Sequence, residues 1–344
     1  MPAEVERFGH HRNSFGFLRL AFAALVIVAH TPELYDGNRS RELLTMAFGT
    51  ITFGELAVDG FFLVSGYLIT GSWLKNPDVG AYLRKRVARI FPAFLVCSAI
   101  TVLLVAPLAG ASLNGSSLLL NLRLSFQLAA PIVNYVFLKT PYPALNGAAW
   151  TIPYEFRCYL IVIILGLLGA FRRPWIIGAL VGLEYLGYHA VPATWSPDIP
   201  FYGTLFGSVH ESFRLVSVFL IGSLFYLWRE AIVFTRRGVL VSCLALPVCL
   251  LFTLTAHLGV MAFGGYLTFA IAAHGKGALT EINNRNDVSY GLYLYAWPIE
   301  KLLMWFLPAL PLVAYGVLTL ALSYAAGWTS WLLVEKATLS KFGR

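Results

Sequence analysis

Two side chains in the first apolar segment have types and a spacing that could support acid–base chemistry. Arg19 and His30 lie in FGFLRLAFAALVIVAH, which begins at Phe15. On an α-helix their spacing corresponds to about 1100° of rotation and about 16 Å of rise, so the side chains are only about 20° apart around the helix. Ionisable side chains are costly within a bilayer, so we predict a site in which the imidazole acts as a base or nucleophile. The alternative is that Arg19 snorkels to a headgroup and His30 makes a structural hydrogen bond.

The second apolar segment places an acid among small and aromatic residues. Asp59 lies in GELAVDGFFLVSGYLIT, where a carboxylate is costly unless it is paired, so we predict an intramembrane cation as its partner. Gly60, Ser65 and Gly66 would let a neighbouring helix approach closely. The alternative interpretation of this segment is therefore a packing face with one buried polar contact.

A second candidate acid lies near the outer end of a later segment. Glu155 follows Trp150 by five residues in NGAAWTIPYEFRCYL. If a helix begins near Ala148, Glu155 lies about 10 Å inside the outer boundary, and the same counting places His30 about 8 Å outside the midplane. We therefore expect the carboxylate and the imidazole to share a depth. The alternative is a structural ion pair between Glu155 and Arg157.

A basic cluster precedes the third apolar segment. The stretch YLRKRVARIFP contains Arg84, Lys85, Arg86 and Arg89 in a predicted cytoplasmic turn before Pro92. Such cations commonly anchor a helix at the cytoplasmic face. Arginine forks also match phosphate oxygens, so the cluster is a candidate site for the phosphates of a nucleotide-bearing substrate.

A late apolar segment, NDVSYGLYLYAWPIEK, adds further polar candidates. Asp287, Ser289 and Tyr290 are available for substrate contacts, although an acid at this position also suits a helix start and tyrosines favour membrane interfaces. Other histidines lie at predicted span ends or in loops, where a satisfied or solvated imidazole is expected: His189, His210, His257 and His274.

The composition places these side chains in a polytopic membrane protein. The chain has 344 residues, of which 58% are apolar and 12% charged, and its mean hydropathy is +0.71, whereas soluble domains contain about 25% charged residues. We predict an all-α bundle of about ten spans of about 20 residues each, in a single domain over residues 1–344. The predicted spans are 15–34, 53–73, 91–110, 148–170, 175–190, 211–228, 238–256, 258–273, 288–307 and 311–334.

Basic residues set the predicted orientation. With the N-terminus inside, seventeen Lys and Arg residues lie in cytoplasmic segments, four in outside segments and four within spans. The positive-inside rule therefore predicts cytoplasmic tails at 1–14 and 335–344. The first tail lacks the hydrophobic core of a signal peptide, so we expect the first span to be retained. The outside segment 111–147 is expected to lie on the membrane surface as a partial lid.

The remaining composition argues against several classes of ligand. The net charge of +8 comes from basic groups spread over thin loops, without the interleaved aromatic residues of a nucleic-acid groove, so no nucleic-acid partner is expected. The cysteines lie in apolar stretches without paired spacing, which predicts neither a disulfide framework nor a metal site: Cys97, Cys158, Cys243 and Cys249.

Six stretches, in order, resemble the acyltransferase-3 family of integral-membrane acyltransferases, which modify cell-envelope glycans. They are RLAFAALVIVAH, VDGFFLVSGYLI, RKRVARIFP, WTIPYEF, DVSYGLYLYAWP and SWLLVEK. The resemblance covers nearly the whole chain. It implies an O-acyltransferase of the bacterial inner membrane that takes an acetyl group from cytoplasmic acetyl-CoA. The implied acceptor is a hydroxyl of a cell-surface or exported polysaccharide on the outer face.

The resemblance also implies roles for individual residues. Arg19 and His30 match the catalytic motif, Arg86 and Arg89 match the pair implicated at the donor end, and Glu155 matches the acid of the tryptophan-to-glutamate motif. We add Arg84 to the donor cluster. The expected substrate contacts are Asp59, Trp150, Tyr154 and Tyr290. Two positions depart from the family pattern: Ala296 stands where many members have histidine, and Ala337 where many have proline.

We expect the donor phosphates to bind the basic cluster and the pantetheine arm to run past Arg19 to His30. Glu155 would orient the imidazole or bind the acceptor sugar, and His30 would act as a base or take the acyl group first. A transporter of a small polar solute or acyl group is the competing class, although no paired broken helices are evident in the two halves. A non-catalytic partner of polysaccharide export is a third. The acceptor and the oligomeric state are not specified by the sequence.

Overall fold

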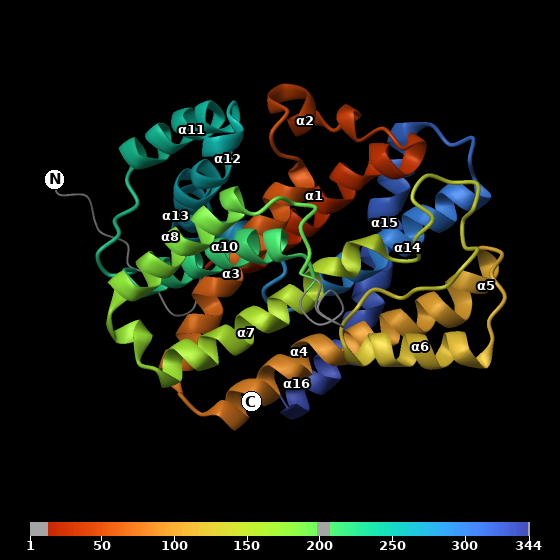
Figure 1. The fold of residues 1–344 in the computed structure, drawn as a ribbon, viewed down its shortest axis with the longest axis horizontal. Coiled ribbons are helices and arrows are strands. Elements are labelled where there is room, and N and C mark those ends of the chain that lie inside the picture. The colour runs from red at the N-terminus through yellow and green to blue at the C-terminus, as the bar shows by residue number, and fades with distance from the viewer. Residues whose placement is uncertain (1–12, 198–206, 343–344) are drawn as a thin grey trace.

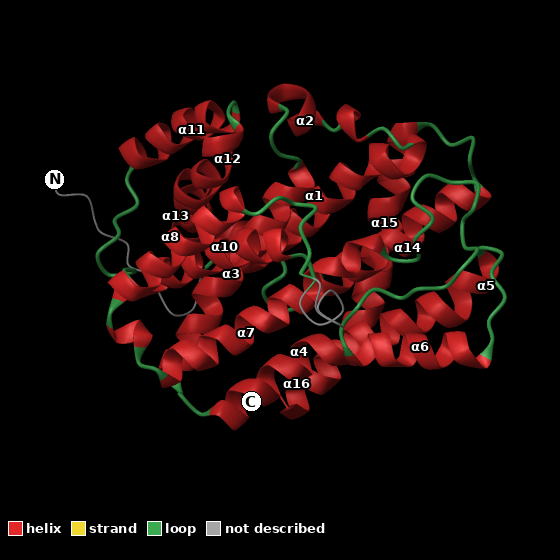
Figure 2. Ribbon diagram, viewed as in Figure 1, coloured by secondary structure: helices red, strands yellow, loops and turns green. Residues whose placement is uncertain are grey.

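The computed structural model describes residues 13–197 and 207–342 (Figure 1). Within these ranges the chain forms helices and loops and no strand, which confirms the all-α prediction for them (Figure 2). The predicted tail 1–14 lies almost entirely outside the described residues. The α-helices are α1 (Phe15–Asp36), α2 (Leu43–Phe48), α3 (Phe53–Lys75), α4 (Val79–Ile100), α5 (Ala106–Leu108), α6 (Gly115–Phe126), α7 (Ile152–Leu167), α8 (Pro174–Ala190), α10 (Val209–Leu227), α11 (Arg236–Leu250), α12 (Thr253–Gly259), α13 (Gly265–His274), α14 (Ser289–Phe306), α15 (Leu312–Ser330) and α16 (Lys336–Phe342).

Seven helical stretches in the described part of the chain are long and apolar enough to cross a membrane, as expected of a multi-pass membrane protein. They are Phe15–Asp36, Phe53–Lys75, Val79–Leu108, Gly147–Leu167, Val209–Leu227, Thr253–His274 and Leu312–Phe342. Helices α8, α11 and α14 occupy the other three predicted span positions. The expected count of about ten is therefore not confirmed within the described residues: α8 and α11 have only 17 and 15 residues, and α14 has 18, among them Glu300 and Lys301.

One segment boundary differs from the prediction. The break expected around His257 instead falls at Leu251 and Phe252, and His257 lies inside α12. Its buried Nε2 atom is 2.9 Å from the Ser217 hydroxyl, so it is satisfied rather than solvated. The outside segment 111–147 contains α6, which begins where the Asn114 side chain accepts a hydrogen bond from a backbone N–H group.

The centre of the bundle is formed by α1, α3, α10 and α14, and the largest buried apolar cluster has members on all four (Figure 1). Helices α3 and α10 pack with their backbones in close contact. A Cβ atom on Gly66 would overlap the carbonyl oxygen of Phe219, and one on Gly222 would overlap that of Leu63. Small residues at this crossing therefore permit the approach, as expected for Gly66.

In the described part of the chain, π-helical turns interrupt long helices at Thr101–Val105 after α4, Val260–Gly264 after α12 and Trp331–Glu335 after α15. Such turns often occur at functional sites. The last one directs Trp331 to a cavity wall and buries Glu335. The helix then continues through Ala337 as α16, packed beside α4 (Figure 1).

Candidate active site

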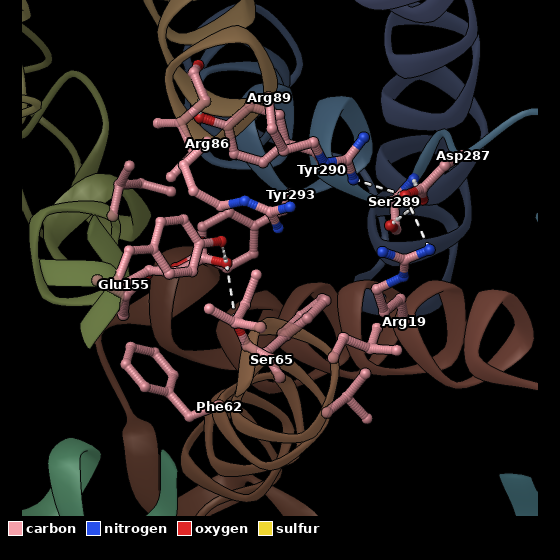
Figure 3. Close-up of a pocket in the computed structure, with 18 of the residues that line it drawn as sticks. Arg19, Phe62, Ser65, Arg86, Arg89, Glu155, Asp287, Ser289, Tyr290 and Tyr293 are labelled. Carbon is pink, nitrogen blue, oxygen red and sulfur yellow. Dashed lines mark hydrogen bonds and ion pairs between the residues drawn. The ribbon is translucent and has the colours of Figure 1, made fainter. Parts of the chain in front are cut away.

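A cavity of about 350 Å³ opens between α1, α3, α4, α7, α14 and the end of the chain (Figure 3). Much of its wall is apolar, with Phe61, Phe62 and Leu68 from α3 and Ile152 from α7. Six charged side chains also line it: Arg19, Lys85, Arg86, Arg89, Glu155 and Asp287. The cavity therefore combines an apolar passage with a concentration of positive charge.

Asp287 binds two of these cations. Its Oδ2 atom lies 3.1 Å from Arg19 Nη2 and 2.5 Å from Arg89 Nη2 (Figure 3). Its other oxygen accepts hydrogen bonds from the Asn283 and Ser289 side chains. Burial raises the pKa of Asp287, but the charges of Arg19 and Arg89 and these hydrogen bonds lower it more, so its pKa lies below its ordinary value. Asp287 thus joins α1, α4 and the start of α14 at the cavity.

Arg89 and Arg86 differ in their partners, although they lie one turn apart on α4. Arg89 also reaches Glu335, with Nη1 3.6 Å from Oε2, so it sits between two carboxylates. Arg86 donates to the Ser72 hydroxyl at 3.3 Å and lies over the rings of Tyr82 and Tyr159. Its buried Nε has no hydrogen-bond partner among the described residues.

Lys85 and Arg86 therefore supply the cavity with cations that no carboxylate neutralises within the described ranges. Arg84, which was predicted to belong to the same cluster, is exposed and does not line the cavity. The helical rotation of α4 separates it from its neighbours, because successive residues point about 100° apart.

Glu155 lies on the wall of the cavity, close to α3. Its Oε1 atom accepts a hydrogen bond from Tyr159 at 2.5 Å and lies 3.5 Å from the Ser65 hydroxyl (Figure 3). Of the two roles considered for Glu155, orienting the imidazole or binding the acceptor sugar, the first has no contact to support it in the described residues, where His30 Nδ1 lies beside Glu33. The Arg157 guanidinium lies 4.8 Å from the centre of the Tyr154 ring.

His30 lines a second cavity, of about 50 Å³. Its Nδ1 atom lies 3.2 Å from Glu33 Oε2, and its ring packs edge-on against Trp297 with 5.0 Å between ring centres. Arg39 contacts the same Glu33 oxygen at 3.2 Å. Sequence reasoning missed Glu33, although its place three residues after His30 on one helix face could have indicated it.

Val58 and Tyr293 line both cavities and so form a shared wall between them. The Tyr293 hydroxyl is 2.7 Å from Thr151 Oγ1 and donates to the carbonyl oxygen of Ala148. Both partners lie in the 3-10 turn Gly147–Thr151 that precedes α7, and these two contacts hold the Tyr293 ring in this wall. The two cavities are therefore neighbours that have these two residues in common.

The four predicted substrate contacts lie in different places. Trp150 is partly exposed in the His30 cavity, and Tyr290 lines the larger cavity with its hydroxyl on the Ile90 carbonyl. Tyr154 lines neither and instead bonds to the backbone of Ser208. Asp59 also lines neither.

Asp59 has the intramembrane cation that was predicted as its partner. It is 1% exposed and its Oδ1 atom lies 2.5 Å from Arg214 Nη1. Arg214 in turn lines the His30 cavity, so Asp59 reaches that site through Arg214. Within the described residues no group of three or more His, Cys, Asp or Glu side chains is arranged to hold a metal ion.

Comparison with known proteins identifies the class of enzyme. A family model described as an acyltransferase domain matches residues 12–329. An O-acetyl transferase of Shigella phage Sf6 is 27% identical over 361 aligned positions, covering 96% of this chain and 97% of that protein. Nodulation protein 10 of Rhizobium leguminosarum bv. viciae is 26% identical over 98% of this chain and 96% of its own length.

A third relative that is also named as an acyltransferase matches a shorter part of the chain. Acyltransferase MdmB of Streptomyces mycarofaciens is 28% identical over 40% of this chain and 35% of its own length. No solved structure matches the chain. The family match covers nearly the whole sequence and includes every residue that lines the His30 cavity. This acyl-transferring enzyme of the membrane therefore belongs to the acyltransferase-3 family.

Proposed function

We propose that this enzyme transfers an acetyl group from cytoplasmic acetyl-CoA to a hydroxyl of a cell-surface or exported polysaccharide on the outer face. In this proposal the chain is one domain of the bacterial inner membrane, with about ten crossings of the bilayer and both termini in the cytoplasm. Helix α1 then runs outward, so Arg19 and the larger cavity face the cytoplasm. His30 and the smaller cavity face the exterior.

One observation carries this proposal: two cavities with different chemistry share a wall of two side chains. The larger contains the cations and an apolar passage, and the smaller contains the imidazole. A donor and an acceptor that approach from opposite sides of a membrane would meet at Val58 and Tyr293. A single solute pathway would not need an imidazole bonded to a carboxylate at this point.

The donor is assigned to the larger cavity. Lys85 and Arg86 are the cations available for its phosphates, because Arg89 is bound between carboxylates. The pantetheine arm would follow the apolar wall toward Tyr293. Arg19 has a buried Nε without a hydrogen-bond partner in the described residues, so it can donate to a polar group of the arm. Glu155, on the same wall, can accept a hydrogen bond from a pantetheine amide.

In the chemical step, His30 Nε2 takes the proton of the acceptor hydroxyl. The acceptor oxygen forms a bond to the thioester carbonyl carbon, the C–S bond breaks, and the coenzyme A thiolate takes the proton back from the imidazolium. Trp150 offers an indole face to a sugar ring beside His30. Asp59 stabilises Arg214 at the same cavity.

The proposal is tested with purified protein in liposomes supplied with radiolabelled acetyl-CoA. Binding of the donor and release of acetate or coenzyme A thiol are measured for the wild type, His30→Ala and Arg86→Gln. We expect His30→Ala to bind the donor but lose turnover, and Arg86→Gln to bind it more weakly. Arg172→Gln, at an exposed site away from both cavities, is the matched control. A wild type that neither binds nor turns over acetyl-CoA would overturn the donor assignment.

A further inference from the structure

We infer that Glu33 is a positioning residue that holds the His30 ring as a neutral base with its Nε2 lone pair directed at the acceptor. The inference deepens the proposed function, because it rests on His30 being the base. It starts from a contact within one helix turn: His30 Nδ1 lies 3.2 Å from Glu33 Oε2. In a neutral imidazole only one nitrogen carries a proton. If Nδ1 carries it and donates a hydrogen bond to the carboxylate, Nε2 is unprotonated and can accept a proton.

Glu33 is itself held in place. Glu33 is only 5% exposed, and its Oε2 atom also accepts a hydrogen bond from Arg39 Nε at 3.2 Å. Its backbone carbonyl accepts a hydrogen bond from the N–H group of Gly37, whose left-handed conformation ends α1. A buried carboxylate with a cationic partner stays ionised at lower cost than an isolated one. Glu33 can therefore accept a hydrogen bond from the Nδ1–H group throughout a catalytic cycle.

The imidazole is restrained from a second direction. Trp297 of α14 packs edge-on to the ring at 5.0 Å between centres. Because Nδ1 is hydrogen-bonded to Glu33 and the ring packs against Trp297, rotation of the imidazole would break the hydrogen bond or the aromatic contact. The ring plane is thus set by α1 and α14 together.

The same contact supplies electrostatic stabilisation. When Nε2 takes the acceptor proton, positive charge develops on a ring that already touches a carboxylate, and no solvent reorganisation is needed. The other charged groups facing this site are Arg39 after α1, Glu55 on α3, Arg214 on α10, and Glu300 on α14 through Thr31. In the described residues only Glu33 bonds to the ring itself.

The test compares Glu33→Gln with Asp36→Asn. Asp36 is the next carboxylate on α1 and pairs with the exposed Arg41, away from the imidazole. We expect Glu33→Gln to lower kcat by about 100- to 10,000-fold, the usual range for a general base, with little change in the KM for acetyl-CoA. Glu33→Asp should recover part of kcat, and Asp36→Asn should resemble the wild type.

A measurement without turnover separates this inference from the proposed function. Nitrogen-15 histidine NMR of the protein in nanodiscs, with the His30 signal assigned by its loss in His30→Gln, reports the tautomer directly. We expect Nδ1-protonated His30 in the wild type and a larger share of the Nε2-protonated tautomer in Glu33→Gln, because a neutral amide is a weaker acceptor than a carboxylate. An unchanged tautomer population would refute the role of Glu33. The expected NMR change without acetyl-CoA turnover would support Glu33 and refute the donor assignment.

Discussion

Replacing Arg86 and Arg89 one at a time by Gln should produce two different defects, although the residues share one face of α4. Arg89 contacts Asp287 at 2.5 Å and Glu335 at 3.6 Å. Arg86 contacts the uncharged Ser72 hydroxyl at 3.3 Å. We therefore expect Arg86→Gln to weaken donor binding and Arg89→Gln to destabilise the fold.

The expected magnitudes of the two defects follow from the contacts that each arginine makes. A hydrogen bond to a charged group contributes about 1.5 to 3 kcal/mol, so loss of Arg86 from a donor phosphate should raise the Kd for acetyl-CoA by about 10- to 150-fold. The lower end is expected, because Arg86 gives up its contacts with Tyr82 and Tyr159 on binding. Breaking a buried ion pair costs about 3 to 5 kcal/mol. The Arg89 side chain is 21% exposed and Arg19 remains on Asp287, so we expect a loss of about 2 kcal/mol.

The assay measures binding of radiolabelled acetyl-CoA and the thermal unfolding midpoint of each variant in nanodiscs. Arg172→Gln controls for loss of a positive charge elsewhere on the protein. The reasoning fails if Arg89→Gln leaves the midpoint unchanged while weakening the donor as much as Arg86→Gln. It also fails if Arg86→Gln lowers the midpoint without changing the Kd.

Three further changes test other parts of the structure. The pKa of Asp287 is lowered in the folded protein, so its stabilisation is present above its ordinary pKa near 3.8 and is lost as the pH falls through the lower folded value. Asp287→Asn should therefore lower the unfolding midpoint at pH 7 and flatten the loss of stability on acidification, as measured by thermal scans across pH. Val58→Trp should fill the boundary between the two cavities and abolish turnover, while the Kd for acetyl-CoA stays unchanged. Turnover at the wild-type rate would contradict the two-cavity arrangement. Gly66→Ala should lower the midpoint because its methyl group meets the Phe219 carbonyl, whereas Gly178→Ala, in open space, should not; equal midpoints would contradict the close α3–α10 packing.

The sequence was enough to predict helices and the depth of single side chains within them. Apolar runs with rare charges require membrane helices, because the bilayer leaves no other way to satisfy the backbone. The rise per residue then places Arg19 and His30 at two depths on one stripe, and the structure puts them in two different cavities. The need of Asp59 for a cation was also predictable, since an unpaired acid is costly there.

Only the tertiary structure decided which carboxylate meets which cation. Hydropathy sets the depth of a helix but not its rotation or its neighbours, which depend on packing such as that of Gly66 against Phe219. Asp287 therefore binds cations that lie 268 and 198 residues before it, on α1 and α4. Glu155 turns to Tyr159 instead of His30 for the same reason. Helices that are similar in apolar character can pack in many arrangements, and the buried polar contacts belong to the one arrangement that forms.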